Sequence, residues 1–486
     1  MDFQTQYGGL GSSNGLPSYL GYAVSQFFGN GGQQAYVARI AWDGSLGWTG
    51  SPPAAKPARA ASAAAVGGAF TLYATSPGSW GNNIAVKVSA DPGPSTGFAL
   101  QVLGGGGELL EDFACLSVSP ADPRYVVTVI NGGSQNVTFA NPAQPNAAIP
   151  PPARPSSTPA SGVKLAGGLD GPILAPGDAN FETALGAGNA AASNSLYGVG
   201  LLNLVESFNL LCVPGETDET TIQQLQQYCV RKRAFLIVDC PQAITRDSLY
   251  SGRLGTGPGG GTPGGLTGEN SRNSAYYYPW VLAPDPLAAN RPALFPPSGF
   301  VAGIYASTDS NQGVWKAPAG TAARLAGAAG LQTDLTDLEL GDLAGRAVNC
   351  LRQFEALGEV VWGARTLAGG DQASSQWKYV PIRRLALFIE SSLYAGTKWV
   401  VFEPNGDALW SRIRSTVASF MQGLFLQGAF QGTTPQEAYF VRCDSGNNTQ
   451  ADIDQGIVNI LVGFAPLYPA EFVVIQIAQM VAQSQY

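Results

Sequence analysis

A buried strand, an amphipathic helix and a second buried strand follow one another between residues 208 and 241. FNLLCVP (208–214) and AFLIVDCP (234–241) are almost wholly apolar, and the helix between them carries Ile222, Leu225 and Cys229. Strands that are apolar along their whole length are typically covered on both faces of a parallel sheet, and a strand–helix–strand unit implies parallel pairing. The segment therefore predicts an α/β unit.

The carboxyl-terminal part reads as α+β. VNCLRQF and GEVVWGART form a hairpin-like pair, WKYVPIRRLALFIESSLYAG leads into a helix, and WVVF (399–402) reads as an apolar strand before the turn Pro-Asn-Gly. We expect Asn405 to cap the next helix, on which Leu409, Ile413, Val417 and Leu424 share one apolar face. Two strands then close the chain, and residues 471–478 are nearly all apolar. An apolar terminal strand needs a partner, either in its own domain or in a neighbouring subunit.

A different pattern precedes the α/β unit. Leu20, Val24 and Phe27 recur at helical spacing, and AYVARI (35–40) alternates as a strand. Four short β-type runs, AFTLYAT, NIAVKVSA, FALQVLG and RYVVTVI, then predict a small β-domain over roughly 69–140. A proline-rich stretch, 141–162, closes it.

The composition is typical of a subunit whose surface is largely buried in contacts with other subunits. Charged residues make up 12% of the 486-residue chain, about half the usual share, so we expect extensive contact with copies of itself, with a low-charge monomer as the alternative. A formal net charge of −8 and the lack of a basic stripe argue against nucleic-acid binding. No run is long enough for a membrane span, and the amino end has no signal-peptide pattern.

The chain contains no histidine. Ser-His-Asp and Cys-His mechanisms are therefore excluded, as are the histidine-containing sites typical of catalytic zinc. The six cysteines are scattered without a C-x-x-C pair, which indicates reduced thiols rather than a disulfide framework. We expect no cofactor and no metal.

Several motifs have simpler interpretations. GSSNG (11–15) matches a nucleophile elbow at Ser13, but the strand and helix that an elbow needs are missing. Glu403 and Asp407 could form a glycosidase-like pair, although a helix-start role explains Asp407 more simply. DSGNNTQADIDQG (444–456) lacks the glycine and the glutamate that the EF-hand pattern needs at its sixth and twelfth positions. The glycine loop 251–268 is not followed by Lys-Ser/Thr and does not lie between a strand and a helix, as a phosphate-binding loop would.

A set of carboxyl-terminal motifs, in this order, resembles the tail sheath proteins of contractile phages and phage-like contractile injection systems. The motifs are GVWKAPAG, VVWGARTL, WKYVPIRRL, WVVFEPN, GAFQGTTPQEAYFVRCD, DIDQG and APLYPAEFVVIQI. AVSQFFGNGGQQAYVARI (23–40) also resembles the family's early segment. The resemblance covers the first forty residues and roughly 200–486.

The resemblance implies a structural polymer, not an enzyme. Sheath subunits of that family stack around an inner tube and contract on a baseplate signal to drive the tube through a target envelope. The implied partners are further copies of the chain, the inner tube, and baseplate and terminal cap proteins, without nucleic acid or membrane insertion. The implied location is assembly in the cytoplasm, as part of a phage tail or tail-like particle.

The resemblance also implies particular sites. A carboxyl-terminal strand and an amino-terminal arm link neighbouring subunits in the family. Here the linking strand would be Glu471, Phe472, Val473, Val474, Ile475, Gln476 and Ile477. Family members usually begin some dozens of residues earlier, so the origin of the arm stays open. The helix after Asn405 would face the tube, and we expect Arg412 and Arg414 to meet acidic tube residues.

The expected architecture is α/β and multidomain, and its central domain would be similar in fold to subtilisin without a catalytic triad. The expected parts are an amino-terminal segment (1–48), an inserted β-rich domain (49–165), the α/β sheath domain (196–368) and a carboxyl-terminal sheath domain (369–486). Two alternatives stay open: a carboxylate-dependent hydrolase using Glu403 and Asp407, and a non-contractile tube or shell. The sequence does not separate a phage tail from an injection particle.

Overall fold

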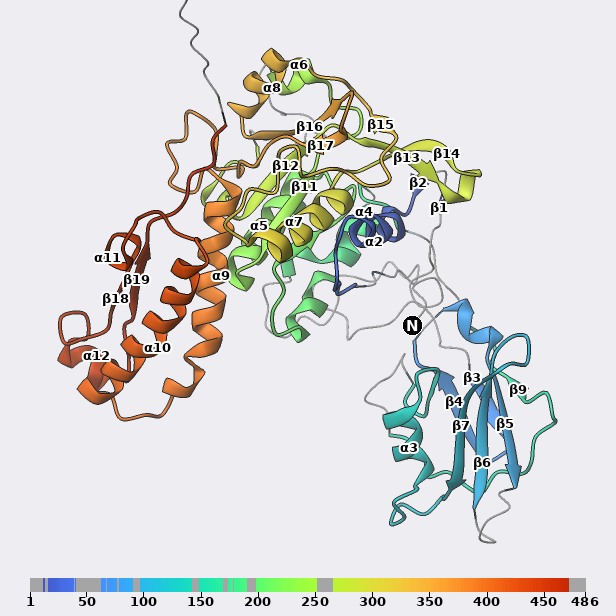
Figure 1. The fold of residues 1–486 in the computed structure, drawn as a ribbon. Helices are drawn as coiled ribbons and strands as arrows, with labels where there is room; N and C mark the ends of the chain where they lie inside the picture. The colour runs from blue at the N-terminus through green and yellow to red at the C-terminus, as the bar shows by residue number, and fades with distance from the viewer. Residues whose placement is uncertain are drawn as a thin grey trace, which may run out of the picture.

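The computed structural model describes residues 12–13, 16–38, 40, 63–66, 68–76, 78–90, 97–141, 148–168, 174–177, 179–189, 198–250 and 265–471. Within these residues the fold is mixed α/β and has several units (Figure 1). A five-stranded sheet forms its centre. Its strands, in spatial order, are β10 (Leu210–Cys212), β11 (Phe235–Asp239), β12 (Ser274–Tyr278), β16 (Val348–Phe354) and β17 (Gly358–Val361).

The first four strands of this sheet are parallel, and β17 forms an antiparallel hairpin with β16. Both predictions from the sequence, the parallel strand–helix–strand unit and the hairpin, are confirmed. Asp218 caps the connecting helix α5 (Glu219–Lys232) by accepting a hydrogen bond from the backbone N–H of Thr221 at 2.8 Å.

Alternate residues of the central strands enter two separate cores. Leu236 and Val238 of β11 belong to one core, while Phe235 and Ile237 belong to the other. The first core is closed by α5 and α8 (Asp337–Ala344), and the second by α2 (Tyr19–Gly29), α7 (Ser298–Gln312) and α9 (Val380–Gly396). The unit is therefore a sheet between two helical layers.

Shorter elements complete the α/β unit. A three-stranded antiparallel sheet has the order β14, β13, β15. The bounds are β13 (Val281–Asp285), η5 (Pro286–Ala288), β14 (Arg291–Phe295), β15 (Gly330–Leu331), α4 (Ala179–Leu185), η2 (Ala187–Asn189), η3 (Gly198–Leu204), α6 (Arg246–Tyr250), η4 (Glu269–Asn273), β1 (Ser12–Ser13) and β2 (Leu16–Pro17).

The helix predicted from Leu20 and Val24 is confirmed as α2, but the strand predicted at 35–40 is wrong over its described part. Residues 33–38 form no strand. Alternation alone does not make a strand, because the backbone also needs a neighbour with which to pair.

The inserted β-unit has its own core. A four-stranded sheet in the order β7, β6, β5, β9 and a three-stranded sheet in the order β3, β4, β8 enclose Leu72, Val86, Leu100 and Ile130. The bounds are β3 (Ala63–Val66), β4 (Phe70–Ala74), η1 (Ser79–Asn83), β5 (Ala85–Ala90), β6 (Phe98–Leu103), β7 (Leu109–Leu116), α3 (Val126–Gly133), β8 (Val137–Thr138) and β9 (Val163–Lys164).

The predicted strand RYVVTVI (124–130) is wrong, since this segment leads into helix α3. Val126 and Ile130, four residues apart, both point into the β-unit's core. Packing of this face outweighs the strand preference of the β-branched residues.

The carboxyl-terminal unit has a fourth core, between α9, α10 (Asp407–Leu426) and a two-stranded sheet. Figure 1 shows α9 and α10 side by side, extending away from the central sheet. The predicted apolar face of α10 is confirmed, because Leu409, Ile413, Val417 and Leu424 are all buried. The other elements are η6 (Lys398–Val400), α11 (Pro435–Ala438), β18 (Tyr439–Arg442), α12 (Gln450–Asp454) and β19 (Leu461–Phe464).

The strand predicted at 399–402 is wrong. Residues 398–400 form the 3-10 turn η6, and Val401 and Phe402 protrude into solvent. No strand lies beside them among the described elements. The predicted cap is also wrong: Gly406 is the N-cap of α10, and the Asn405 side chain accepts a hydrogen bond from the indole N–H of Trp410 at 2.8 Å.

Candidate functional site

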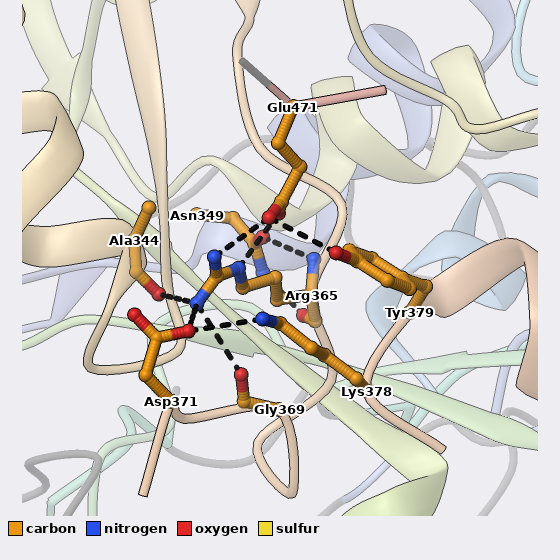
Figure 2. A network of polar contacts seen from close by, with 8 residues as sticks. All are labelled: Ala344, Asn349, Arg365, Gly369, Asp371, Lys378, Tyr379 and Glu471. Carbon is orange, nitrogen blue, oxygen red and sulfur yellow. Dashed lines mark hydrogen bonds and ion pairs between the residues drawn. The ribbon is translucent and has the colours of Figure 1, made fainter. Parts of the chain in front are cut away.

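A network of polar contacts lies where the carboxyl-terminal segment meets the α/β unit, and we call it the Arg365 site (Figure 2). Arg365 follows β17 and is only 2% exposed. Asn349 of β16 fixes its backbone, because the Arg365 N–H donates to Asn349 Oδ1 and Asn349 Nδ2 donates to the Arg365 carbonyl, both at 2.7 Å. The guanidinium therefore projects from a rigid support.

The guanidinium binds two carboxylates. Its Nε and Nη2 atoms donate to the two carboxylate oxygens of Glu471, each at 2.6 Å. Its Nη1 atom donates to the Ala344 carbonyl at 2.7 Å and to Asp371 at 2.8 Å. Paired hydrogen bonds between arginine and a carboxylate are strong and fix geometry as well as charge.

Neighbouring side chains complete the electrostatics. Tyr379 donates its hydroxyl to Glu471 at 3.1 Å, and burial together with the Glu471 charge raises the pKa of Tyr379 to about 12. Lys378 lies 2.9 Å from Asp371, and its hydrogen bond, with help from Arg365, lowers the pKa of Asp371. Burial lowers the pKa of Arg365, but Glu471 and Asp371 outweigh it and raise that pKa overall.

The site holds the chain at the first residue of the predicted linking strand. Glu471 is in place on Arg365, whereas Phe472, Val473, Val474, Ile475, Gln476 and Ile477 lie outside the described residues. The sequence did not single out Arg365, because its partner Glu471 is 106 residues away. The one available signal was an arginine within the apolar motif VVWGARTL.

The two arginines predicted to contact a tube lie on opposite flanks of the apolar face of α10. Side chains two positions apart on a helix, as these are, project in directions about 200° apart around the helix axis. The Arg412 guanidinium stacks on the Trp399 ring at 4.3 Å. Arg414 is half-buried, and its Nη1 atom donates to the Cys443 carbonyl.

The carboxylates of the alternative hydrolase hypothesis are on the surface. Glu403 lies in the turn before α10 and Asp407 in its first turn, and both are exposed. Asp407 thus has the favourable charge for a helix start. Asp452, part of the rejected calcium motif, closes a capping box with Thr449 at the start of α12.

A second buried polar pair lies at the carboxyl edge of the central sheet. Asp239, at the end of β11, accepts hydrogen bonds from the backbone N–H and hydroxyl of Ser298, both at 2.7 Å, and from the Gly215 N–H at 2.9 Å. Burial raises the pKa of Asp239 to about 6, although these hydrogen bonds oppose the rise. Without histidine, this Asp–Ser pair lacks the base of a triad, and it ties α7 to the sheet.

The residues that the structure describes contain no cluster of three or more histidine, cysteine or acidic side chains suited to a metal ion. None of their helices combines the length and apolar character required to cross a membrane.

Known proteins place the chain in a family. The profile for the phage tail sheath protein central domain matches residues 186–367, and the profile for the phage tail sheath C-terminal domain matches residues 372–479. The putative prophage major tail sheath protein of Pseudomonas aeruginosa is 27% identical over 296 residues, which is 58% of this chain and 69% of the relative.

Similar proteins are also found among solved structures. The sheath complex PVC of an extracellular contractile injection system, in its contracted state, is 34% identical over 57% of this chain and 72% of its own, with a TM-score of 0.48. The crystal structure of a sheath tail protein from Listeria innocua shares the fold, with a TM-score of 0.52 over 85% of this chain and 82% of its own, at 14% identity. The chain belongs to the phage tail sheath protein family and is a structural sheath subunit.

Proposed function

We propose that this subunit polymerises around an inner tube and contracts, driving the tube through a target envelope. The observation that carries the proposal is the match of both sheath domains together with 34% identity to a contractile sheath. Contraction would be a rigid-body rearrangement of subunits whose strand linkages persist. The work would come from strain stored during assembly, without a cofactor and without catalysis.

We propose that the segment Glu471 to Ile477 is the linking strand between subunits. The Arg365 site supports this role, because a bidentate ion pair holds the first residue of the segment on its own subunit. A strand that pulls on a neighbour needs such a fixed origin. The described part of the β18–β19 sheet has only two strands, and we propose its edges as the acceptor for a neighbour's strand.

We propose that α10 faces the inner tube, with Arg412 and Arg414 meeting acidic tube residues. Arg412, which is exposed on α10 outside the buried apolar face, supports this orientation, whereas Arg414 projects about 200° away around the helix and is half-buried. Reversing both charges to glutamate should abolish assembly on the tube and leave sheath-to-sheath contacts intact. Unchanged co-sedimentation of the variant with tubes would contradict this contact.

We further propose the domain division 1–48, 49–165, 196–368 and 369–486, with a central domain similar in fold to subtilisin. The separate cores of the β-unit and of the carboxyl-terminal unit support the division. The buried Asp239–Ser298 pair is compatible with a scaffold of that kind that has no catalytic role. Baseplate and terminal cap proteins are the proposed partners at the two ends, and the cytoplasm is the proposed place of assembly.

Proline substitutions test the linking strand. Proline removes a backbone donor from a strand ladder, so Val473→Pro with Ile475→Pro should leave folded subunits that form no long cylinders in negative-stain electron microscopy. The matched control is Val473→Ala with Ile475→Ala, which keeps both donors and should assemble. Cylinders of normal length from the proline variant would refute the linking role.

A further inference from the structure

An exposed aromatic tip marks the connection between two helices of the carboxyl-terminal unit. Phe402 lies between α9 and α10, and its ring is fully exposed, at 102% of the reference area; the neighbouring Val401 is 62% exposed. Phe402 also has a backbone φ of +72°, which is an outlier for a bulky residue. Residues with strain of this kind cluster at functional sites.

The tip carries negative charge. Glu403 follows Phe402 directly, and Asp407 begins α10. Both carboxylates are exposed, and in the part of the chain that the structure describes neither forms an ion pair. We call Val401, Phe402 and Glu403 the Phe402 tip.

A pocket of matching character lies beside the same two helices, along residues 384–391 of α9 and at the carboxyl end of α10. It has a volume of 280 Å³, and Trp315, Phe388 and Leu424 supply apolar walls. This volume is just below the range of about 300–1,000 Å³ that is usual for small-molecule sites, and it suits a single large side chain.

The rim of the pocket is positive. Arg384 in the wall is neutralised by Asp309, with two contacts at 2.7 and 2.6 Å. Arg233 has no such partner among the described residues; its guanidinium stacks on Tyr394 at 4.5 Å. Arg231 and Lys232 precede it in the sequence at the end of α5, outside the lining of the pocket. An aromatic ring followed by a carboxylate therefore complements this pocket in shape and charge.

A subunit cannot fill its own pocket. The tip precedes the first residue of α10, whereas Leu424 and Gln427 of the pocket lie at the helix's other end. A 20-residue helix is about 30 Å long. The tip and the pocket are two different surfaces of one unit, so a contact between the tip of one copy and the pocket of another is heterologous, the kind that can generate an open polymer.

We propose that the Phe402 tip of one subunit inserts into the pocket beside Arg233 of a second copy, with Glu403 pairing with Arg233. The inference rests on the proposed polymerisation and adds a lateral contact distinct from the linking strand. Phe402 would act as a central aromatic anchor of the interface, surrounded by contacts that exclude water.

Charge exchange tests the contact. Phe402→Ala and Arg233→Glu should each raise the critical concentration for sheath polymerisation at least about tenfold, with subunit circular dichroism and thermal midpoint unchanged. Glu403→Arg combined with Arg233→Glu should restore polymerisation toward wild type. The wild-type protein should polymerise in the same experiment. Failure of the wild-type protein to polymerise would contradict the proposed function rather than this contact.

Photo-crosslinking identifies the occupant. Benzoylphenylalanine placed at position 402 of assembled sheath should crosslink to peptides that contain Phe388 or Leu424 of a second copy. Crosslinks confined to the tube protein, or to another surface of the sheath, would overturn the proposal. Normal polymerisation of Phe402→Ala, or no rescue by the charge exchange, would overturn it as well.

Discussion

The Arg365 site gives the most direct quantitative prediction, for the substitution Glu471→Gln. This change removes one charge and one of the two short acceptors from a guanidinium that is 2% exposed. Removal of one partner from a buried ion pair typically costs about 3–5 kcal/mol. Asp371 remains 2.8 Å from Nη1 and the Glu471 side chain is 20% exposed, so we expect about 2 kcal/mol.

Hydrogen exchange measures this loss locally. At 1.36 kcal/mol per tenfold, about 2 kcal/mol corresponds to an opening equilibrium of residues 461–471 that is roughly 30-fold larger. Mass spectrometry of peptides from this region, in unassembled subunits, should show the corresponding loss of protection. Protection elsewhere, for example in β11, should not change.

The matched control is Glu390→Gln. Glu390 is also the carboxylate partner of a buried arginine, Arg383, at 3.2 Å, but its side chain is 44% exposed. We expect an effect below about 1 kcal/mol, as is usual for exposed pairs. Equal protection of residues 461–471 in wild type and in Glu471→Gln would refute the reasoning that Arg365 holds the carboxyl-terminal segment.

Three further predictions concern the interior. Burial and the neighbouring Glu182 carboxyl raise the pKa of Glu216 to about 9 in the fold. The stabilising effect of the protonated Glu216 is therefore complete below pH 4.5 and is lost as pH rises through 9. A thermal-melting series from pH 5 to 9 should slope downward, and the same steep slope in Glu216→Gln would contradict this. Met421→Ala, at a fully buried position, should cost about 2–5 kcal/mol in denaturant unfolding, whereas the exposed Ser419→Ala should cost under about 0.5 kcal/mol. Asn349→Ala leaves the buried N–H and carbonyl of Arg365 unpaired and should cost about 2–4 kcal/mol; a change below 1 kcal/mol in the same titration would show that these bonds are replaced.

The sequence predicted the elements whose own pattern is decisive. The apolar run of β11 and the capped helix before it predicted the parallel unit. The apolar face of α10 predicted its burial, because the spacing of Leu409, Ile413 and Val417 leaves no other face for a core. These signals are local, and no distant partner is needed to interpret them.

The failures share one physical cause. Residues 399–402 and 124–130 have strand-like composition, and only the surrounding fold decides between strand, turn and helix. The Arg365 site joins Arg365 to Asn349, which is 16 residues away in the sequence, and to Glu471, which is 106 residues away. Such a site is created by the tertiary fold, so spacing along the chain could not indicate it.

Electron microscopy of the purified protein tests the central claim most directly. The account predicts long hollow cylinders with a regular helical repeat, formed by this chain alone or on addition of its tube. Dispersed particles of subunit size under all assembly conditions would contradict the claim that this chain polymerises as a contractile sheath.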